Sequence, residues 1–505
     1  MTFDVVVAGG GPVGLMLACE LRLAGASPVV LERRAEAGTL PKANGLVGRI
    51  VEMLDYRGLL ERFKAEAAFT GAFPSFPFGS VPLDFSRLDT GPLRGMAIQQ
   101  PRMESLLTGR AEELDVEIRR GHEIHGLSQD DDSVHLDVLG PDGEYRLTAP
   151  YLVGCDGGHS FVREQAGIGF PGTTDEDVVR LGHFKAADSV AAFQDPEFGN
   201  LKPGWNRTEH GRIMVMSLQP GVQIVGVRER RQQRIDLTSP LELEEFRASV
   251  RRVLGRDLPF GEPIWLSRTV SQARQAEKYR TGRILLAGDA AHLFPAGGSA
   301  LNVGLLDTVN LGWKLAAQVQ GRAPAGLLDT YHSERHPVGA RTLMQTRAQA
   351  ALERAEDEEG DALRGLLTKI FAFEDPLKHL GELLHGSHVR YDTPGAGTHP
   401  LLGRFAPDLI LETSSGLTRV AELLRAAKPV LLDLADRQDL RDAANSWADR
   451  ITVVTARCGK PPADALLIRP DGYVAWAAEG SPTGLRTALA HWFGAARSQL
   501  APERA

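Results

Sequence analysis

The chain has 505 residues, 43% of them hydrophobic and 24% charged, which are the proportions of a globular protein with room for about three domains. Its net charge of −8 argues against nucleic acid or an anionic membrane as the main partner, because attraction to phosphate requires a basic face. The three cysteines are odd in number and have no CxxC spacing, which predicts a cytoplasmic protein without a disulfide framework.

The N-terminal residues have the order of a dinucleotide-binding unit. An apolar run at 3–8 ends in the turn Gly-Gly-Gly-Pro-Val-Gly at 9–14 and is followed by a helical stretch at 15–23. A second apolar run, 28–31, precedes Glu32. The first run lacks the basic segment of a signal peptide, so export is not expected. No apolar run is long enough to cross a membrane.

Each residue type in this fingerprint has a physical role. Gly9 permits the tight turn, Gly11 lets the backbone approach a pyrophosphate, and Gly14 lets helix and strand pack closely. The phosphates then lie at the positive helix N-terminus, and Glu32 accepts hydrogen bonds from ribose hydroxyls. The candidate contacts are Gly9, Gly11, Pro12, Val13, Gly14 and Glu32. The fingerprint alone leaves NAD and FAD open.

Two further buried strands end in an aspartate. The run 151–154 delivers Asp156, and the run 283–287 delivers Asp289. A carboxylate at the carboxyl end of a strand suits ribityl or ribose hydroxyls, since it accepts hydrogen bonds from diols.

A small-residue segment then leads into a helical stretch at 303–319. Its N–H groups and partial positive charge suit the pyrimidine edge of an isoalloxazine. This segment contributes the candidates Pro295, Gly297, Gly298, Leu301 and Asn302. His292, just before it, is interpreted as a side chain packed beside this helix rather than as a base.

The middle of the chain predicts an antiparallel sheet, from alternating runs at 212–217 and 222–227. Phenylalanines in the proline-rich loop 69–78 either wall a cavity or pack beneath the loop. His332 and His336 share a helical face, but no third ligand is spaced to join them, so no metal site is expected. Glu334 and Arg335 predict a solvated helix end before Pro337.

These motifs, in this order, resemble the single-component FAD-dependent aromatic hydroxylases of the p-hydroxybenzoate and phenol hydroxylase type. The resemblance covers nearly the whole chain. Within this family, the chain most resembles the hydroxylases that tailor aromatic polyketides such as angucyclines, anthracyclines and tetracyclines. The segments 328–337, 399–403 and 469–476 carry that narrower likeness.

The resemblance implies an α/β fold with a Rossmann-like FAD-binding domain formed by residues 1–175 and 268–390. An inserted antiparallel-sheet substrate domain would span 176–267. A linker at 391–400 would lead to a thioredoxin-like domain at 401–505, which lacks a redox CxxC and is expected to have a structural or dimerisation role. A homodimer is therefore a candidate assembly.

The resemblance also implies site residues. Arg33 matches a basic residue beside the adenosine ribose, and Gln100 matches a glutamine at the flavin ribityl chain. Relatives have the sequence Gly-Gly-Gln-Gly where this chain has Gly297-Gly298-Ser299-Ala300. Ala300 is expected to resist the positive φ that a glycine would tolerate. The candidate substrate contacts are Phe73, His183, Met214, Met216 and Pro295.

The implied reaction is hydroxylation of a polycyclic phenol by O₂, with NADPH or NADH as reductant. The flavin hydroperoxide supplies the oxygen, so no side chain is assigned as catalytic. A Baeyer–Villiger oxygen insertion remains an enzymatic alternative, and a flavin-binding sequestration protein without turnover is the alternative from another class.

Overall fold

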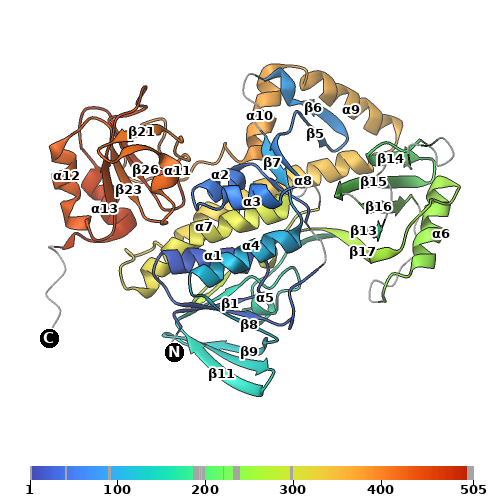
Figure 1. Cartoon of the computed structure of the whole chain (residues 1–505), viewed down its shortest axis with the longest axis horizontal. Coiled ribbons are helices and arrows are strands. Elements are labelled where there is room, and N and C mark those ends of the chain that lie inside the picture. Colours follow the sequence, from blue (N-terminus) through green and yellow to red (C-terminus); the bar gives the residue numbers. More distant parts are fainter. Residues whose placement is uncertain are drawn as a thin grey trace. The chain divides into compact units, whose positions relative to one another are not determined.

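A computed structural model describes the chain over residues 3–39, 43–88, 93–185, 193, 195, 200–219, 221–230, 239–295 and 299–497. The backbone divides into two compact units. The first unit comprises Met1–Pro171, Gln275–Leu293 and Gly297–Ala505, and the second comprises Gly172–Arg274 and Phe294–Ala296. Their elements are labelled in Figure 1.

The centre of the first unit is a six-stranded sheet with the order β18-β19-β12-β1-β2-β8. All neighbours are parallel except β18 and β19. The strands are β1 (Val5–Ala8), β2 (Pro28–Glu32), β8 (Glu117–Arg120), β12 (Tyr151–Gly154), β18 (Arg280–Thr281) and β19 (Ile284–Leu286). The three central strands are buried along their whole length, which explains their continuous apolar sequence. The predicted strands of the three motifs are thus confirmed.

Helices cover this sheet. Helix α1 (Pro12–Leu23) packs against α4 (Gln100–Glu113) and α7 (Ser299–Val319), and the three lie side by side in Figure 1. The predicted helix at 303–319 is confirmed and begins four residues earlier than expected. Because α1 and α7 both start at the carboxyl edge of the sheet, their N-termini face the same region.

Smaller elements complete this part of the first unit. The stretch at 69–78 forms two short strands instead of a loop. The remaining elements are β3 (Leu46–Val47), α2 (Arg49–Asp55), α3 (Leu60–Glu66), β4 (Phe69–Ala72), β5 (Ser75–Phe78), β6 (Val81–Asp84), β7 (Arg94–Ala97), β9 (Glu123–Gln129), β10 (Val134–Gly140), β11 (Gly143–Ala149), α5 (Phe161–Gln165), β20 (His292–Leu293), α8 (Thr330–Arg354), α9 (Glu358–Ile370) and α10 (Glu374–His385).

Helix α8 corrects one expectation from the sequence. The helix does not end before Pro337 but continues through it for seventeen further residues, to Arg354. Glu334 and Arg335 are not solvated either: 7% and 2% of their surfaces are exposed. The prediction was wrong because it took two charged side chains as a sign of solvent, whereas both have buried ionic partners.

The C-terminal residues of the first unit form a four-stranded sheet with the order β24-β23-β25-β26. Strands β23 and β24 are parallel, and the other two pairs are antiparallel. The elements are β21 (Ile410–Thr413), β22 (Gly416–Arg419), α11 (Val420–Leu423), β23 (Val430–Asp433), α12 (Gln438–Ala444), β24 (Thr452–Thr455), β25 (Ala465–Ile468), β26 (Val474–Ala478) and α13 (Leu485–Phe493). The apolar runs at 429–433, 451–455 and 465–468 of the sequence predict three strands in this region, and β23, β24 and β25 confirm them.

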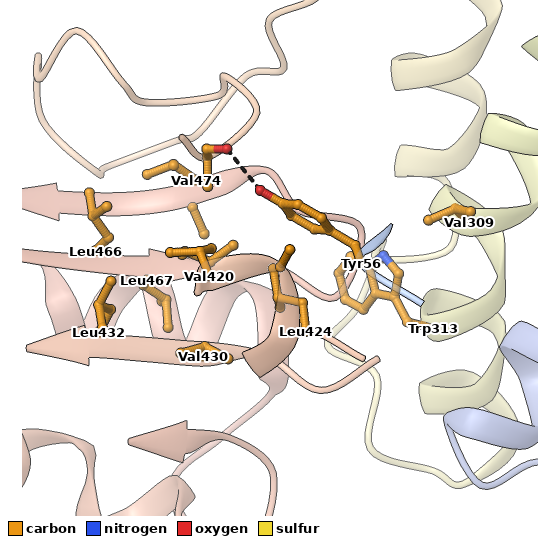
Figure 2. Packing of buried hydrophobic residues seen from close by; sticks show 14 of the residues in the cluster. Tyr56, Val309, Trp313, Val420, Leu424, Val430, Leu432, Leu466, Leu467 and Val474 are labelled. Carbon is orange, nitrogen blue, oxygen red and sulfur yellow. Dashed lines mark hydrogen bonds between the residues drawn. The ribbon is translucent and has the colours of Figure 1, made fainter. Parts of the chain in front are cut away.

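One hydrophobic core joins this C-terminal sheet to the helices of the FAD-type motifs. Figure 2 shows Tyr56 and Trp313 beside Leu424 of the C-terminal region. The Tyr56 hydroxyl donates to the carbonyl of Ala406 at 3.1 Å. Because core residues from both regions interdigitate, the C-terminal region is packed as part of the first unit.

The second unit is built on an antiparallel sheet in which β14, β15, β16, β13 and β17 lie in that order. Its elements are β13 (Gly172–Lys185), β14 (Gly204–Thr208), β15 (Gly211–Gln219), β16 (Val222–Glu229), α6 (Leu243–Leu254) and β17 (Pro263–Gln275). One sheet face buries Ile213, Val215 and Val225 against Phe246 and Val250 of α6. The antiparallel sheet predicted from the alternating runs is confirmed.

Among the described residues, no helix is both long enough and apolar enough to cross a bilayer.

Candidate functional site

A cavity of about 750 Å³ lies at the carboxyl ends of β1, β2 and β12, beside the first turns of α1, α4 and α7. Cofactor pockets typically measure about 300–1,000 Å³ and favour this edge of a parallel sheet. The predicted residues that line it are Gly9, Gly11, Pro12, Val13, Glu32, Arg33, Gln100, Asp156, Asp289 and Leu301. The fold therefore brings ten of the sequence candidates to one cavity.

The three fingerprint glycines differ in what surrounds them. Gly9 has φ +104°, and a Cβ there would lie 2.5 Å from the Cys155 carbonyl oxygen. A Cβ on Gly14 would lie 2.0 Å from the Gly9 oxygen, whereas one on Gly11 would meet nothing within 4 Å. Gly9 and Gly14 are thus required by the fold, and Gly11 keeps the cavity open beside an α1 N-terminus that no side chain caps.

Glu32 is held by hydrogen bonds to both of its carboxylate oxygens. The Gly10 N–H donates to Oε2 at 2.7 Å, and the backbone N–H and Nε of Arg34 each donate to Oε1 at 2.9 Å. Burial alone would raise the pKa of Glu32, but the bonds from Arg34 and Gly10 outweigh it and lower the pKa. Glu32 is therefore a fixed anion with lone pairs left for ribose hydroxyls.

Asp156 carries an unsatisfied buried acceptor. Its Oδ2 accepts the N–H of Val162 at 3.0 Å, while Oδ1 is buried without a protein partner. Burial raises the pKa of Asp156 despite a hydrogen bond from Ser160. Asp289, which is exposed, also lines the cavity and follows Gly288 in a short 3-10 turn. An orphaned acceptor beside a second carboxylate suits a ligand rich in hydroxyl groups.

Gln100 begins α4 and is fixed through its side chain. Its amide nitrogen donates at 2.8 Å to Oε1 of Glu104, which is buried. This bond orients the amide, so that its oxygen remains to accept a hydrogen bond from a ligand.

Some candidates lie elsewhere. Gly14 packs against Gly9 and Val7, and Asn302 accepts the Val47 N–H at 3.0 Å. Pro295 belongs to the second unit, where its carbonyl accepts the Ser271 hydroxyl at 2.8 Å. Gly297 and Gly298 lie outside the described residues.

Sequence reasoning missed several residues that line the cavity, among them Arg34 and Asn44. Arg34 also binds Glu32, and this contact across two residues depends on the turn after β2, which no sequence pattern indicated. Ala300 also lines the cavity. It lies in the first turn of α7 and has no positive φ, so the expected conflict with Ala300 does not arise in this structure.

Three substrate candidates share one face of the second unit's sheet. His183 lies opposite Ile224, which lies opposite Met216, and Met214 pairs with Trp205. Burial lowers the pKa of His183, whose ring lies 5.1 Å from that of Trp265 in an edge-on arrangement. This face is opposite to the one covered by α6 and is rich in sulfur and aromatic groups.

The fourth candidate, Phe73, lies in the first unit and packs with Phe76 against a cluster that includes Leu93. Its ring is 5.6 Å from that of Phe69. Of the two roles left open for it, packing is the one that its contacts describe.

The two histidines of α8 lie together, with ring centroids 4.7 Å apart and the Tyr279 ring beside both. The described residues contain no group of three or more metal-ligating side chains. His292 donates to or accepts from Asp307 of α7 at 2.7 Å and is fully buried. Its predicted place beside this helix is confirmed.

Comparison with known families identifies the two regions of the chain. A family described as an FAD binding domain matches residues 2–346, and one described as the C-terminal region of aromatic-ring hydroxylases matches residues 399–496. The chain belongs to the FAD-dependent aromatic-ring hydroxylases. The resemblance inferred from the motifs is confirmed.

Individual relatives of this hydroxylase extend over its full length. A 12-dehydrotetracycline 5-monooxygenase/anhydrotetracycline 6-monooxygenase of Streptomyces rimosus is 44% identical, covering 98% of this chain and 99% of the relative. A dialkyldecalin synthase of Streptomyces rugosporus is 40% identical over 98% of this chain and 100% of the relative. The crystal structure of CabE, an aromatic hydroxylase from angucycline biosynthesis, matches with a TM-score of 0.90 and 41% identity, covering 98% and 100% of the two chains.

The hydroxylase is therefore an FAD-dependent monooxygenase that uses NAD(P)H as co-substrate. The residues of the cavity fit FAD: an uncapped helix N-terminus suits the pyrophosphate, and a fixed carboxylate suits a ribose. The orphaned Oδ1 of Asp156 supplies an acceptor for a further hydroxyl.

Proposed function

We propose that this enzyme hydroxylates a polycyclic aromatic polyketide with FAD, NAD(P)H and O₂. The observation that carries the proposal is the full-length similarity, at 44% identity, to a monooxygenase named for tetracycline substrates. The similarity to a hydroxylase from angucycline biosynthesis supports the same substrate class, since both names describe fused-ring phenolic compounds.

In the proposed complex the FAD pyrophosphate lies at Gly11, Pro12 and Val13, where the α1 N-terminus presents unpaired N–H groups. Glu32 and Arg33 would hold the adenosine ribose. The ribityl and flavin portions would contact Gln100, Asp156, Asp289 and Leu301. When bound, FAD accepts hydride from NAD(P)H and activates O₂. The protein's tasks are to fix the ring's orientation and exclude water from it.

We assign the substrate to the sheet face that carries His183, Met214 and Met216. Trp205 and Trp265 lie on the same face, and flat aromatic ligands pack well on aromatic and thioether groups. His183 is held neutral by burial, so this face would present little charge to an apolar ring system.

The finer organisation is also proposed. The FAD-binding domain would comprise 1–175 and 268–390, the substrate domain 176–267, the linker 391–400, and a thioredoxin-like domain 401–505. The sheet order and the mixed strand directions of the C-terminal region support the last assignment. A cytoplasmic location and a homodimer complete the proposal.

The test is mass spectrometry of products formed under ¹⁸O₂ from a panel of polycyclic phenols, with NAD(P)H consumption recorded in parallel. Hydroxylation predicts a product carrying one ¹⁸O and NAD(P)H oxidation that the substrate accelerates. A lactone carrying ¹⁸O would move the assignment to Baeyer–Villiger insertion.

Two results would contradict an oxygenase altogether. Ligand binding without NAD(P)H consumption would indicate a sequestration protein. A product isomeric with its substrate and free of ¹⁸O would indicate a non-oxidative synthase, and the 40% identity to a dialkyldecalin synthase makes this outcome worth measuring.

A further inference from the structure

Helix α7 carries a buried polar stripe that the FAD site does not use. Asp307, Asn310 and Lys314 are spaced three and four residues apart, so their side chains lie on one helix face. None of the three exposes more than 2% of its surface. Buried charges require partners, and the partners from other elements come from α8, from the C-terminal region and from the segment 288–292.

The C-terminal partner is Arg469, at the end of β25. Its Nη1 and Nη2 donate to the two carboxylate oxygens of Glu334 on α8, at 2.6 and 2.7 Å, and its Nε donates to Asp471 at 3.0 Å. Lys314 donates to Glu334 at 2.7 Å, and Asn310 donates to Glu334 at 2.6 Å and to Asp471 at 3.1 Å. The turn between β25 and β26 is thus bonded to both α7 and α8.

The next residue of α8 continues the network toward the cofactor cavity. Arg335 donates through Nε to Asp307 Oδ1 at 2.7 Å and through Nη1 to the Tyr391 hydroxyl at 3.1 Å. Asp307 Oδ2 in turn contacts His292 Nε2 at 2.7 Å and accepts the Gly288 N–H at 3.4 Å. Gly288 immediately precedes Asp289, which lines the cavity.

The geometry of this network is tightly constrained. It contains three cations (Lys314, Arg335, Arg469) and three carboxylates (Asp307, Glu334, Asp471), so the charges balance. A bidentate guanidinium–carboxylate pair fixes angle as well as distance. A shift of the 469–471 turn would leave charged atoms unpaired in the core, and burial already lowers the pKa of Lys314 to about 8. The structure therefore favours one position of α7 relative to the turn.

We propose that Arg469 and Asp307 are positioning residues for FAD, through which the C-terminal region holds the Gly288-Asp289 turn and the first turn of α7. Ala300 and Leu301 of that first turn line the cavity, so Asp307 is connected to the cavity both through the Gly288-Asp289 turn and along α7. This inference rests on the flavin placement proposed above, and it gives the C-terminal region, which lacks a CxxC motif, a role in cofactor binding.

The first test measures the FAD dissociation constant of apoprotein variants by flavin fluorescence. Asp307→Asn keeps the size of the side chain and removes its charge, and Arg469→Met removes the guanidinium. A coupling between sites usually changes affinity by about 5- to 150-fold, and we expect a weakening in that range for both variants. Tyr391→Phe, which removes only the hydroxyl bonded to Arg335, provides a milder variant if Arg469→Met does not fold.

Asp433→Asn is the matched control. Asp433 is a fully buried carboxylate of the same C-terminal sheet, bonded to Arg441 at 2.6 Å and to the Arg437 N–H at 2.8 Å. These partners do not belong to the network, so this variant should bind FAD like the unmodified protein. An equal loss of affinity in the control would overturn the proposal, because it would show that any lost charge in this region has the same effect.

The second test uses reciprocity, which a merely structural role would not produce. If the turn at 469–473 favours FAD binding, FAD must stabilise that turn by the same factor. Hydrogen–deuterium exchange at 469–473 should slow when FAD is added to the apoprotein, and Asp307→Asn should abolish this slowing. Exchange that is indifferent to FAD, or unchanged FAD affinity in folded Asp307→Asn, would refute the proposal. Neither readout involves product, so absence of hydroxylation would count against the proposed function alone.

Discussion

Gly11 and Gly14 give the sharpest test of how the N-terminal turn works. A Cβ on Gly14 would lie 2.0 Å from the Gly9 carbonyl oxygen and 3.3 Å from Val7 Cγ1. Strand β1 and helix α1 must therefore separate in Gly14→Ala. Overpacking of this kind costs roughly 1–3 kcal/mol, and the thermal midpoint of the apoprotein should fall by a few degrees.

Gly11→Ala should behave in the opposite way. A Cβ there meets no atom within 4 Å, and the φ of −78° is open to alanine. Alanine is a poorer N-cap than glycine, but it lowers the entropy of the unfolded chain by about 0.4–1 kcal/mol, so the two effects nearly cancel. The added methyl instead enters the space assigned to the pyrophosphate. A clash of about 1–3 kcal/mol would raise the FAD dissociation constant by roughly 5- to 150-fold.

The assays are differential scanning fluorimetry of the apoproteins and titration with FAD. Gly109→Ala is the control: Gly109 lies inside α4, and a Cβ there also meets nothing within 4 Å. It should raise stability by up to about 1 kcal/mol through helix propensity and leave FAD affinity unchanged. The reasoning is refuted if Gly11→Ala binds FAD normally, or if Gly14→Ala is as stable as the unmodified chain.

Further outcomes are expected at four other positions. Asp289→Ala should raise the FAD dissociation constant by about 10- to 150-fold, since a charged hydrogen bond contributes about 1.5–3 kcal/mol; unchanged affinity in a fluorescence titration would remove Asp289 from the site. Cys458→Ser should leave NADPH oxidation and hydroxylation rates unchanged, because Cys458 has no neighbouring cysteine in sequence for thiol exchange. Ala300→Gly should alter FAD affinity by less than about threefold, because Ala300 needs no positive φ; higher coupling of NADPH use to product would show that the turn matters after all. Burial lowers the pKa of His183 from its ordinary value of 6.5. Below pH 6.5 the unfolded chain therefore binds a proton at His183 more readily than the folded chain does, and the free energy of unfolding decreases as the pH falls. His183→Phe should therefore reduce the loss of thermal midpoint on acidification, and an unchanged pH profile would contradict a buried neutral His183.

Local signals were enough to predict in outline which residues line the cavity. The runs ending at Ala8, Glu32 and Gly154 are apolar because each strand is buried on both faces. The carboxyl ends of parallel strands meet at one edge of a sheet, so the motifs alone predicted that Glu32 and Asp156 lie at the same site. The sequence-based strands at 429–433, 451–455 and 465–468 were correct because their apolar runs are likewise buried in a sheet.

Contacts that depend on tertiary neighbours could not be predicted. Arg34 reaches Glu32 because of the turn after β2, which the composition does not indicate. Asn302 accepts the Val47 N–H from 255 positions away along the chain. Pro337 lies within α8, although the residue before a proline usually avoids helical geometry.

The misjudged residues Glu334 and Arg335 show where sequence reasoning reached its limit. Two adjacent charges are usually solvated. Glu334 and Arg335 can be buried because they form ion pairs with Arg469 and Asp307, which belong to other elements. An interface made only of apolar residues can slide, whereas paired buried charges must keep their register. The apolar contacts around Trp313 then stabilise the docking of the C-terminal region, and the ionic network selects one geometry for it. Since α7 runs from that network to the cavity, the same register would set the position of Ala300 and Leu301, as the proposal for Arg469 and Asp307 requires.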